Sequence, residues 1–281
     1  MRRVLFLLLF LVLPCNAAAV AAQTLDRIKE TGVIRLGVRE DAAPFSWRTE
    51  QGGIAGYSVE LCVAVAQYIK LDLALADLQA ELVTVSAADR FDAIAGGRID
   101  LLCEATSATL SRREKVDFSL PTYIDGASVL LRPDGPESFA GLAGHRIGVL
   151  HGTTTEQSLG QALQEEGVAA ELIAVGTHDE GLEQLKAGKI DAYFADRTIL
   201  QFMMLGDAEA KDFKLADRYF TYEPYALALP LGDGAFRLAV DRALSRIYRT
   251  KTIEKIFAAT FQQGQASDAL RYLFLITPLP D

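Results

Sequence analysis

Apolar residues alternate between two patterns along the first hundred positions. Residues 33–38 form a short apolar run, which is typical of a strand, and 57–69 carry apolar side chains at helical spacing. The pattern then predicts a strand at 81–85, a helix at 90–95 and a strand at 99–103. Strands that alternate with helices indicate an α/β sheet with helices on its faces.

The same alternation starts again after a Pro/Gly-rich break at 132–136. Beyond the break, strand-like and helical segments follow one another at 146–150, 155–164, 171–175, 180–186 and 191–195. Two complete α/β units in tandem predict two lobes.

The last part of the chain lacks a third complete unit, so we expect it to return to the first lobe. It has a strand-like run at 225–229 and helical patterns at 235–248 and 253–261. The chain would then cross between the lobes twice, near 125–131 and 219–226, and such paired crossings act as a hinge. The expected division is a signal peptide at 1–22, lobe 1 at 23–126 and 224–264, lobe 2 at 127–223, and a C-terminal extension at 265–281.

The N-terminus has the features of a secretory signal peptide. Arg2 and Arg3 precede a purely apolar stretch at 4–13 and a run of small residues that ends at Ala22, where we expect cleavage. A lipid anchor at Cys15 is the alternative, but the Leu-Pro pair before it fits a lipidation site poorly. These features predict an exported, periplasmic protein that is not held by a membrane span.

The charge balance is acidic, with a net charge of −9 for the chain. Nucleic acid is therefore excluded as a partner, because its phosphates need a basic face. An anionic ligand is not excluded, because a few arginines can dominate the potential inside a cleft.

Cys62 and Cys103 remain after signal cleavage. An even count in an exported chain permits one disulfide, with two buried free thiols as the alternative.

Three polar segments supply groups suited to a small zwitterion. Arg112 can bind a carboxylate with its planar fork. Thr153 and Thr154 follow a glycine after a strand, where they can offer hydroxyls and N–H groups to an anion or simply cap a helix. Asp196 follows another strand, where it can accept from an ammonium group or cap the next helix.

In order and spacing, these segments resemble the family-3 extracellular solute-binding proteins, the polar amino-acid receptors of bacterial ABC importers. The resemblance spans nearly everything from Leu25 to Phe261 and rests on 37–40 with 44–46, 56–58, 89–90 with Gly97 and Asp100, Arg112 with 117–119, Gly148 with 152–154, and 191–196. It implies a periplasmic-binding-protein-like fold of type II, with two α/β lobes joined by a two-crossing hinge. It further implies a monomer that serves an ABC permease in the membrane.

The resemblance also assigns roles to the polar residues. Ser107 and Arg112 from lobe 1, with Thr153 and Thr154 from lobe 2, would hold the α-carboxylate of a free amino acid. Asp196 would hold its ammonium group.

Specificity would depend on three further residues. Arg39, Arg90 and His178 lie where glutamate/aspartate-binding members carry cationic or donor groups, which implies an acidic ligand side chain. Ala87 and Ala105 stand where those members carry serines, so a neutral polar amino acid remains an alternative.

Phe45 has two interpretations. It would pack against the aliphatic part of the ligand if it follows the family, or it belongs to the core.

Two other functions remain open. The protein could sense a ligand for a separate receptor, or act as a cyclohexadienyl or arogenate dehydratase. For the dehydratase, Glu104 is the one candidate for a general acid or base. The sequence has no HExxH, GxSxG or Cys/His cluster with metal spacing, so no metal or other cofactor is expected. We therefore predict a receptor without turnover.

Overall fold

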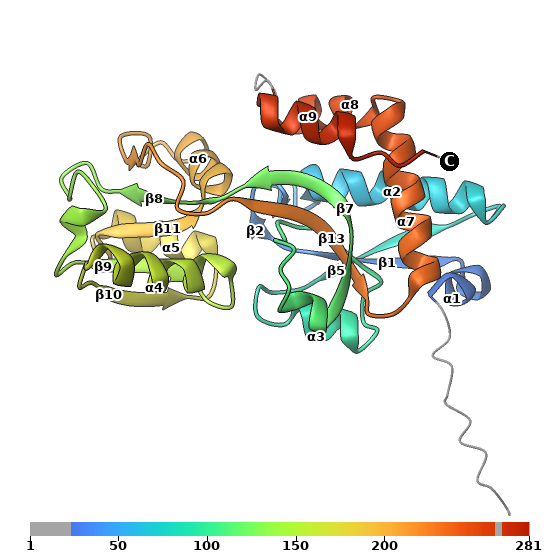
Figure 1. Cartoon of the computed structure of the whole chain (residues 1–281), viewed down its shortest axis with the longest axis horizontal. Helices are drawn as coiled ribbons and strands as arrows, with labels where there is room; N and C mark the ends of the chain where they lie inside the picture. The colour runs from blue at the N-terminus through green and yellow to red at the C-terminus, as the bar shows by residue number, and fades with distance from the viewer. Residues whose placement is uncertain (1–23, 262–265, 281) are drawn as a thin grey trace, which may run out of the picture.

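The computed structural model describes residues 24–261 and 266–280, which form two lobes side by side (Figure 1). The predicted signal peptide, including Cys15, lies outside the described residues. None of the described helices is both long and apolar enough to cross a membrane.

Lobe 1 is built on a five-stranded sheet with the strand order β5-β1-β6-β13-β7. These strands are β1 (Val33–Val38), β5 (Gln79–Thr84), β6 (Leu101–Leu102), β7 (Val116–Asp125) and β13 (Glu223–Pro230). The apolar side chains of Ile34, Leu36 and Val38 are fully buried, which is why β1 lies inside the sheet. A small antiparallel sheet of β2 (Asp41–Ala42), β3 (Ser46–Arg48) and β4 (Ile54–Ala55) adjoins it.

Helices cover the sheet of lobe 1. They are α1 (Thr24–Thr31), α2 (Tyr57–Asp72), α3 (Arg90–Ala95), α7 (Gly234–Arg249) and α8 (Thr252–Phe261), with a 3₁₀ turn, η1, at Arg112–Glu114. On α2, Leu61, Val65 and Ile69 are buried at helical spacing in the same core as β1. Phe236, Val240 and Ile253 of α7 and α8 are buried in this core too, so the segment after β13 packs on lobe 1.

Lobe 2 repeats the arrangement with the strand order β10-β9-β11-β8-β12. Its strands are β8 (Ala127–Leu131), β9 (Arg146–Leu150), β10 (Glu171–Val175), β11 (Ala192–Asp196) and β12 (Lys214–Leu215). Its helices are α4 (Thr154–Glu166), α5 (His178–Lys186), α6 (Arg197–Gly206) and the 3₁₀ turn η2 (Ala140–Leu142). Two cores of its own, around Val149 and Tyr193, make lobe 2 a separate unit.

Two neighbouring strands connect the lobes (Figure 1). β7 ends at Asp125, and a single residue separates it from the start of β8. On the neighbouring strand, β13 begins at Glu223, directly opposite Asp125. Only glycine fits between the two strands, because a Cβ on Gly126 would lie 1.9 Å from the carbonyl oxygen of Thr221. The predicted two-crossing α/β fold is thus confirmed.

β7 and β6 depart from the sequence expectations. We did not predict β7 because Pro121 and the polar residues Asp117, Ser119 and Thr122 interrupt the apolar pattern of its segment. A strand was expected at 99–103, but β6 has only two residues. Ile99 and Asp100 come before the part of the chain that pairs with β1.

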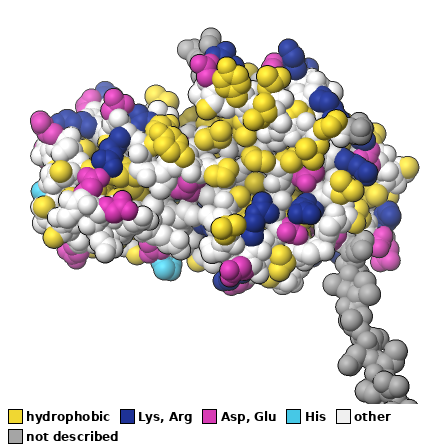
Figure 2. All heavy atoms as spheres, viewed as in Figure 1, with side chains coloured by type: hydrophobic (Ala, Val, Ile, Leu, Met, Phe, Trp, Pro, Cys, Tyr) yellow, Lys and Arg dark blue, Asp and Glu magenta, His cyan; other side chains and the backbone are white. Residues whose placement is uncertain are grey.

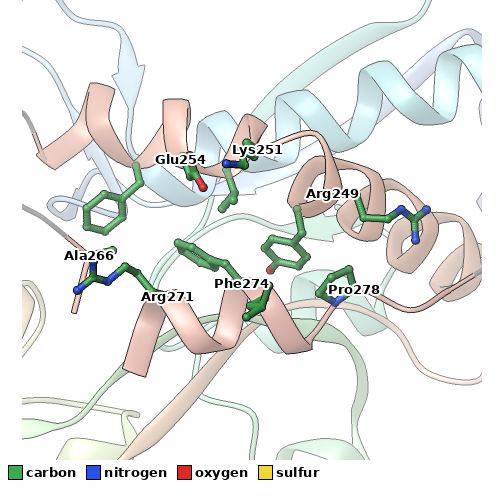
Figure 3. A pocket seen from close by; sticks show the side chains of 11 residues that line it. Arg249, Lys251, Glu254, Ala266, Arg271, Phe274 and Pro278 are labelled. Atoms are coloured by element: carbon green, nitrogen blue, oxygen red, sulfur yellow. The ribbon is translucent and has the colours of Figure 1, made fainter. Parts of the chain in front are cut away.

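The C-terminal segment forms α9 (Asp268–Ile276), which lies beside α7 and α8 (Figure 1). Phe274 stacks on Tyr248 with ring centroids 5.7 Å apart, so the helix is docked on lobe 1. A groove of about 720 Å³ remains between these helices; its wall includes Ile253, Phe257 and Pro278 (Figure 3). Hydrophobic side chains are exposed on this side of the molecule (Figure 2), including Tyr272, Leu275 and Ile276.

A disulfide joins α2 to β6. Cys62 and Cys103 are both fully buried, and their Cα atoms lie 6.0 Å apart. The bridge closes a loop across a sequence separation of 41 residues, which restricts the unfolded chain.

We predict that replacing both cysteines by alanine lowers the free energy of unfolding by about 2–4 kcal/mol, because the unfolded chain loses its cross-link. Denaturant unfolding of the chain without residues 1–22 measures this difference. A thiol assay on the denatured, unreduced protein should find no titratable thiol. Two titratable thiols would contradict the bridge.

Candidate functional site

The predicted polar residues meet in a small cavity between the lobes. Lobe 1 and lobe 2 both contribute to its wall, which consists of Arg39, Arg90, Ala105, Ser107, Arg112, Thr153, Thr154, Thr155, His178, Asp196 and Ile199. The cavity volume is only about 10 Å³, which is room for about one water molecule. The lobes are therefore closed on each other, and they must separate before a solute can enter.

Hydroxyls from both lobes converge on one carboxylate. Thr154 Oγ1 donates to Glu223 Oε2 at 2.7 Å, and Ser107 Oγ donates to the same oxygen. The two hydroxyl oxygens lie 3.3 Å apart, across the boundary between the lobes. Glu223 thus shows that the two hydroxyls can hold a carboxylate together.

Thr153 lines the cavity but uses its hydroxyl for the helix. It is the N-cap of α4, where Oγ1 accepts from the N–H of Glu156 at 3.2 Å and donates to the carbonyl of Leu150 at 2.6 Å. The capping role, which the sequence left open, is the one that the hydroxyl has.

Arg112 is held toward the cavity by its own loop. Its Nη1 donates to the carbonyl of Ser107 at 2.8 Å, and its guanidinium lies over the ring of Phe91. Burial lowers the pKa of Arg112, and the carboxylates of Glu104 and Glu223 oppose this effect. The neighbouring Arg113 is exposed and lies over Phe118 instead.

Asp196 ends β11 directly before α6 but makes no side-chain cap hydrogen bond. Its Oδ1 is buried without a hydrogen-bond partner among the described residues. Burial raises its pKa well above the usual range, and the carboxylates of Glu223 and Asp125 raise it further. The same effects raise the pKa of Asp125 to about 6. Asp196 is thus an acceptor that still needs a donor, preferably a cationic one.

The other end of the cavity contains paired charges. Arg39 Nε and Nη2 donate to Asp41 Oδ1 at 2.9 and 2.7 Å, and Arg39 Nη1 lies 3.6 Å from Glu104 Oε2. Arg90 Nε lies 3.2 Å from Glu104 Oε1. Burial opposes the charge of Arg39, yet Glu104 and Asp41 together raise its pKa, whereas burial lowers the pKa of Arg90 to about 10.

His178 is the first residue of α5 and is buried rather than exposed. Its Nδ1 lies 3.0 Å from the hydroxyl of Tyr193. Burial and the nearby charge of Arg39 lower the pKa of His178 to about 3, so the ring is neutral at physiological pH.

Asp41 connects the two lobes at this end. Its Oδ2 accepts from the backbone N–H of His178 at 2.9 Å, while Arg39 binds the same carboxylate from lobe 1. A carboxylate of lobe 1 therefore lies at the N-terminus of a lobe 2 helix, where the helix dipole stabilises it.

Phe45 requires a correction, because it does not line the cavity. It is fully buried in an aromatic cluster, with ring centroids 4.9 Å from Tyr123 and 5.2 Å from Tyr225. The Ala43–Pro44 bond before it is cis. Of its two interpretations, the structure supports the core residue.

The sequence did not predict the contacts that three acidic residues make around the cavity: Asp41, Glu104 and Glu223. Each directly follows or begins an element at the edge where the lobes meet. That position was visible in the sequence for Glu104, at the end of a predicted strand. The contacts of Asp41 and Glu223 with lobe 2 depend on lobe closure, which no local pattern encodes.

Two α/β lobes with two neighbouring connections and a polar cavity between them define a two-lobed solute-binding protein. The chain belongs to the bacterial extracellular solute-binding proteins of family 3, whose sequence model matches residues 34–263.

Curated relatives include amino-acid-binding proteins of transport systems. An L-glutamate/L-aspartate-binding protein of Pseudomonas aeruginosa is 29% identical over 242 residues, which cover 85% of this chain and 80% of the relative. The glutamate/aspartate import solute-binding protein of Escherichia coli is 26% identical over 248 residues, covering 88% and 82%.

Among solved structures, an ancestral amino acid-binding protein described as a precursor of cyclohexadienyl dehydratase has a TM-score of 0.72. It is 26% identical, and the match covers 85% of this chain and all of the other. Proteins with this fold thus include binding proteins that preceded an enzyme.

We predict that Asp41→Ala shifts the ligand-free protein toward an open form. The substitution removes a charge-assisted hydrogen bond between the lobes, worth about 1.5–3 kcal/mol. Small-angle X-ray scattering should show a larger radius of gyration. Glu40→Gln is the matched control, because Glu40 binds Arg48 and Thr84 within lobe 1. Equal radii for wild type and Asp41→Ala would contradict this role.

Proposed function

We propose that the protein captures a free α-amino acid between its lobes and delivers it to the membrane permease of an ABC importer. The observation that carries the proposal is the buried Oδ1 of Asp196, which has no hydrogen-bond partner among the described residues and shares a cavity with Arg112. An α-amino acid brings an ammonium group for the first and a carboxylate for the second. The periplasm and a monomeric state belong to the same proposal.

The α-carboxylate would take the position that Glu223 holds in the closed cleft. There it would accept from Ser107 and Thr154 and face the guanidinium of Arg112. The N-terminus of α4 adds favourable backbone N–H groups, so Thr153 contributes through the helix that it caps. Contacts from both lobes to one carboxylate stabilise closure, because they exist only when the lobes meet.

Glutamate and aspartate are the first candidates for the ligand. Two relatives are named as glutamate- and aspartate-binding proteins. Arg39 and Arg90 line the cavity and can neutralise a side-chain carboxylate, and the buried His178 adds a neutral ring at the same end.

A neutral polar amino acid is a second candidate. Glu104 and Asp41 already pair with the two arginines, and Ala87 and Ala105 provide no hydroxyl for a side-chain carboxylate.

We propose binding without turnover. Glu104, the candidate general acid or base, lies between two arginines and accepts from the hydroxyl of Thr106. These contacts fix the carboxyl group beside the two guanidinium groups, which suits it to neutralising charge rather than to moving a proton.

We predict that a thermal-shift screen of the common amino acids finds a stabilising ligand. A ligand at about 100 times its dissociation constant adds roughly 2.7 kcal/mol of stability. Arg112→Ala should weaken its binding by about tenfold to a hundredfold, because a charge-assisted contact is lost. Arg113→Ala is the matched control, since this neighbour is exposed and should leave binding unchanged. Unweakened binding to Arg112→Ala would refute the carboxylate site.

We also predict that affinity rises with pH over the range in which Asp196 of the empty site titrates. The pKa of Asp196 is raised in the empty site and the ligand ammonium would lower it, so binding in that range releases a proton. The dissociation constant should fall by up to about tenfold per pH unit until Asp196 is ionised without ligand. Calorimetry in buffers of different ionisation enthalpy should detect proton release. Proton uptake, or an affinity that falls with pH, would exclude this role.

A further inference from the structure

A carboxylate of the chain itself lies at the side-chain end of the cavity. Glu104 is 1% exposed and lies between two arginines, with Oε1 3.2 Å from Arg90 Nε and Oε2 3.6 Å from Arg39 Nη1. Its position follows from β6, which ends two residues earlier, and from the buried Cys103 between them. The space between the two guanidinium groups is therefore already occupied by an anion.

The charges at this end balance before any ligand is present. Two cations, Arg39 and Arg90, lie with two anions, Asp41 and Glu104. The ring of His178 adds no charge, because its pKa is lowered to about 3. A ligand carboxylate placed here would add an uncompensated anion to a cavity shielded from bulk water, which is strongly unfavourable. An uncharged group would not.

Hydrogen bonding at this end is incomplete in a specific way. Arg90 Nε and Glu104 Oε2 are buried and have no hydrogen-bond partner among the described residues. Arg90 lines the cavity, whereas Glu104 lies behind its wall, so the arginines that face a ligand are already paired with a buried anion. A carboxamide brings a carbonyl acceptor for an arginine N–H without adding a charge, whereas an ionised carboxylate adds a second anion.

We infer that Glu104 is a specificity-determining residue: its carboxylate occupies the arginine pair that would receive an acidic side chain, and it biases the site toward a ligand with a carboxamide. The inference rests on the proposed function and decides between its two ligand candidates. Arg112, Ser107 and Asp196 would hold the α-amino and α-carboxyl groups in either case.

The test compares ligands that differ only in carboxylate and carboxamide. Calorimetry gives the dissociation constants of glutamate and glutamine, and of aspartate and asparagine, for the wild type and Glu104→Gln. For the wild type, the ratio of the acidic to the amide dissociation constant should exceed one. In Glu104→Gln the ratio should fall at least tenfold, because the arginines lose their internal anion. A defect in folding would weaken both ligands and leave the ratio unchanged.

Glu60→Gln is the matched control, since it removes the same charge from an exposed position on α2 and should leave the ratio as in the wild type. An unchanged or increased ratio overturns the inference when Glu104→Gln unfolds cooperatively as the wild type does. If Glu104→Gln does not fold, Glu104→Asp replaces it; the shorter side chain withdraws the anion from Arg39, so the ratio must again fall.

The outcome separates the inference from the proposed function. If the protein binds an amino acid and that binding requires Arg112, but the ratio of dissociation constants is the same in the wild type and the Glu104 variant, only the inference is refuted. Binding of an amino acid outside both pairs likewise refutes the inference and leaves the proposed function standing. A wild-type protein that binds no amino acid in the thermal-shift screen refutes both.

Discussion

Neutralising buried charge is the constraint on which the closed structure depends. Three arginines line the small cavity between the lobes, and buried carboxyl groups lie on and behind its wall. Charges buried there need partners inside the protein or in a ligand. At one end, Arg39 and Arg90 find theirs in Asp41 and Glu104. At the other end the carboxyl groups of Asp196, Glu223 and Asp125 outnumber the guanidinium of Arg112, and in the proposed function a ligand ammonium would offset this imbalance.

The fold followed from the sequence because it depends on local patterns. Apolar runs and helical spacing predicted β1, α2 and the second α/β unit, and the absence of a third unit predicted the return of α7 and α8 to lobe 1. β7 was not predicted because Pro121 and the polar residues around it interrupt its apolar pattern. Its pairing with β13 is itself irregular, with register shifts between Tyr225 and Ala228.

The sequence predicted which residues form the candidate site but not which of them form ion pairs with one another. Residue chemistry singled out Arg112 and Asp196, and the family resemblance added Arg39 and Arg90; all four line the cavity. They could not show that Glu104 would lie between two of those arginines, because that contact joins the ends of β1 and β6 to the start of α3. Phe45 was ambiguous for a similar reason: an aromatic residue after a proline suits a cleft and a core equally well, and only its packing on Tyr123 separates the two.

The position of the two lobe crossings has a consequence for how an importer tells a loaded receptor from an empty one. Asp125 and Glu223 lie opposite each other where β7 and β13 leave lobe 1, and Asp196 is close enough for both to raise its pKa. Closing an empty cleft brings these acids together away from water, where they hold protons more tightly, in line with the raised pKa values of Asp196 and Asp125. In the proposed function, the ligand ammonium would take the place of a proton among them. The closed shape that a permease would recognise would then be coupled to the presence of cargo by the acids of the hinge itself.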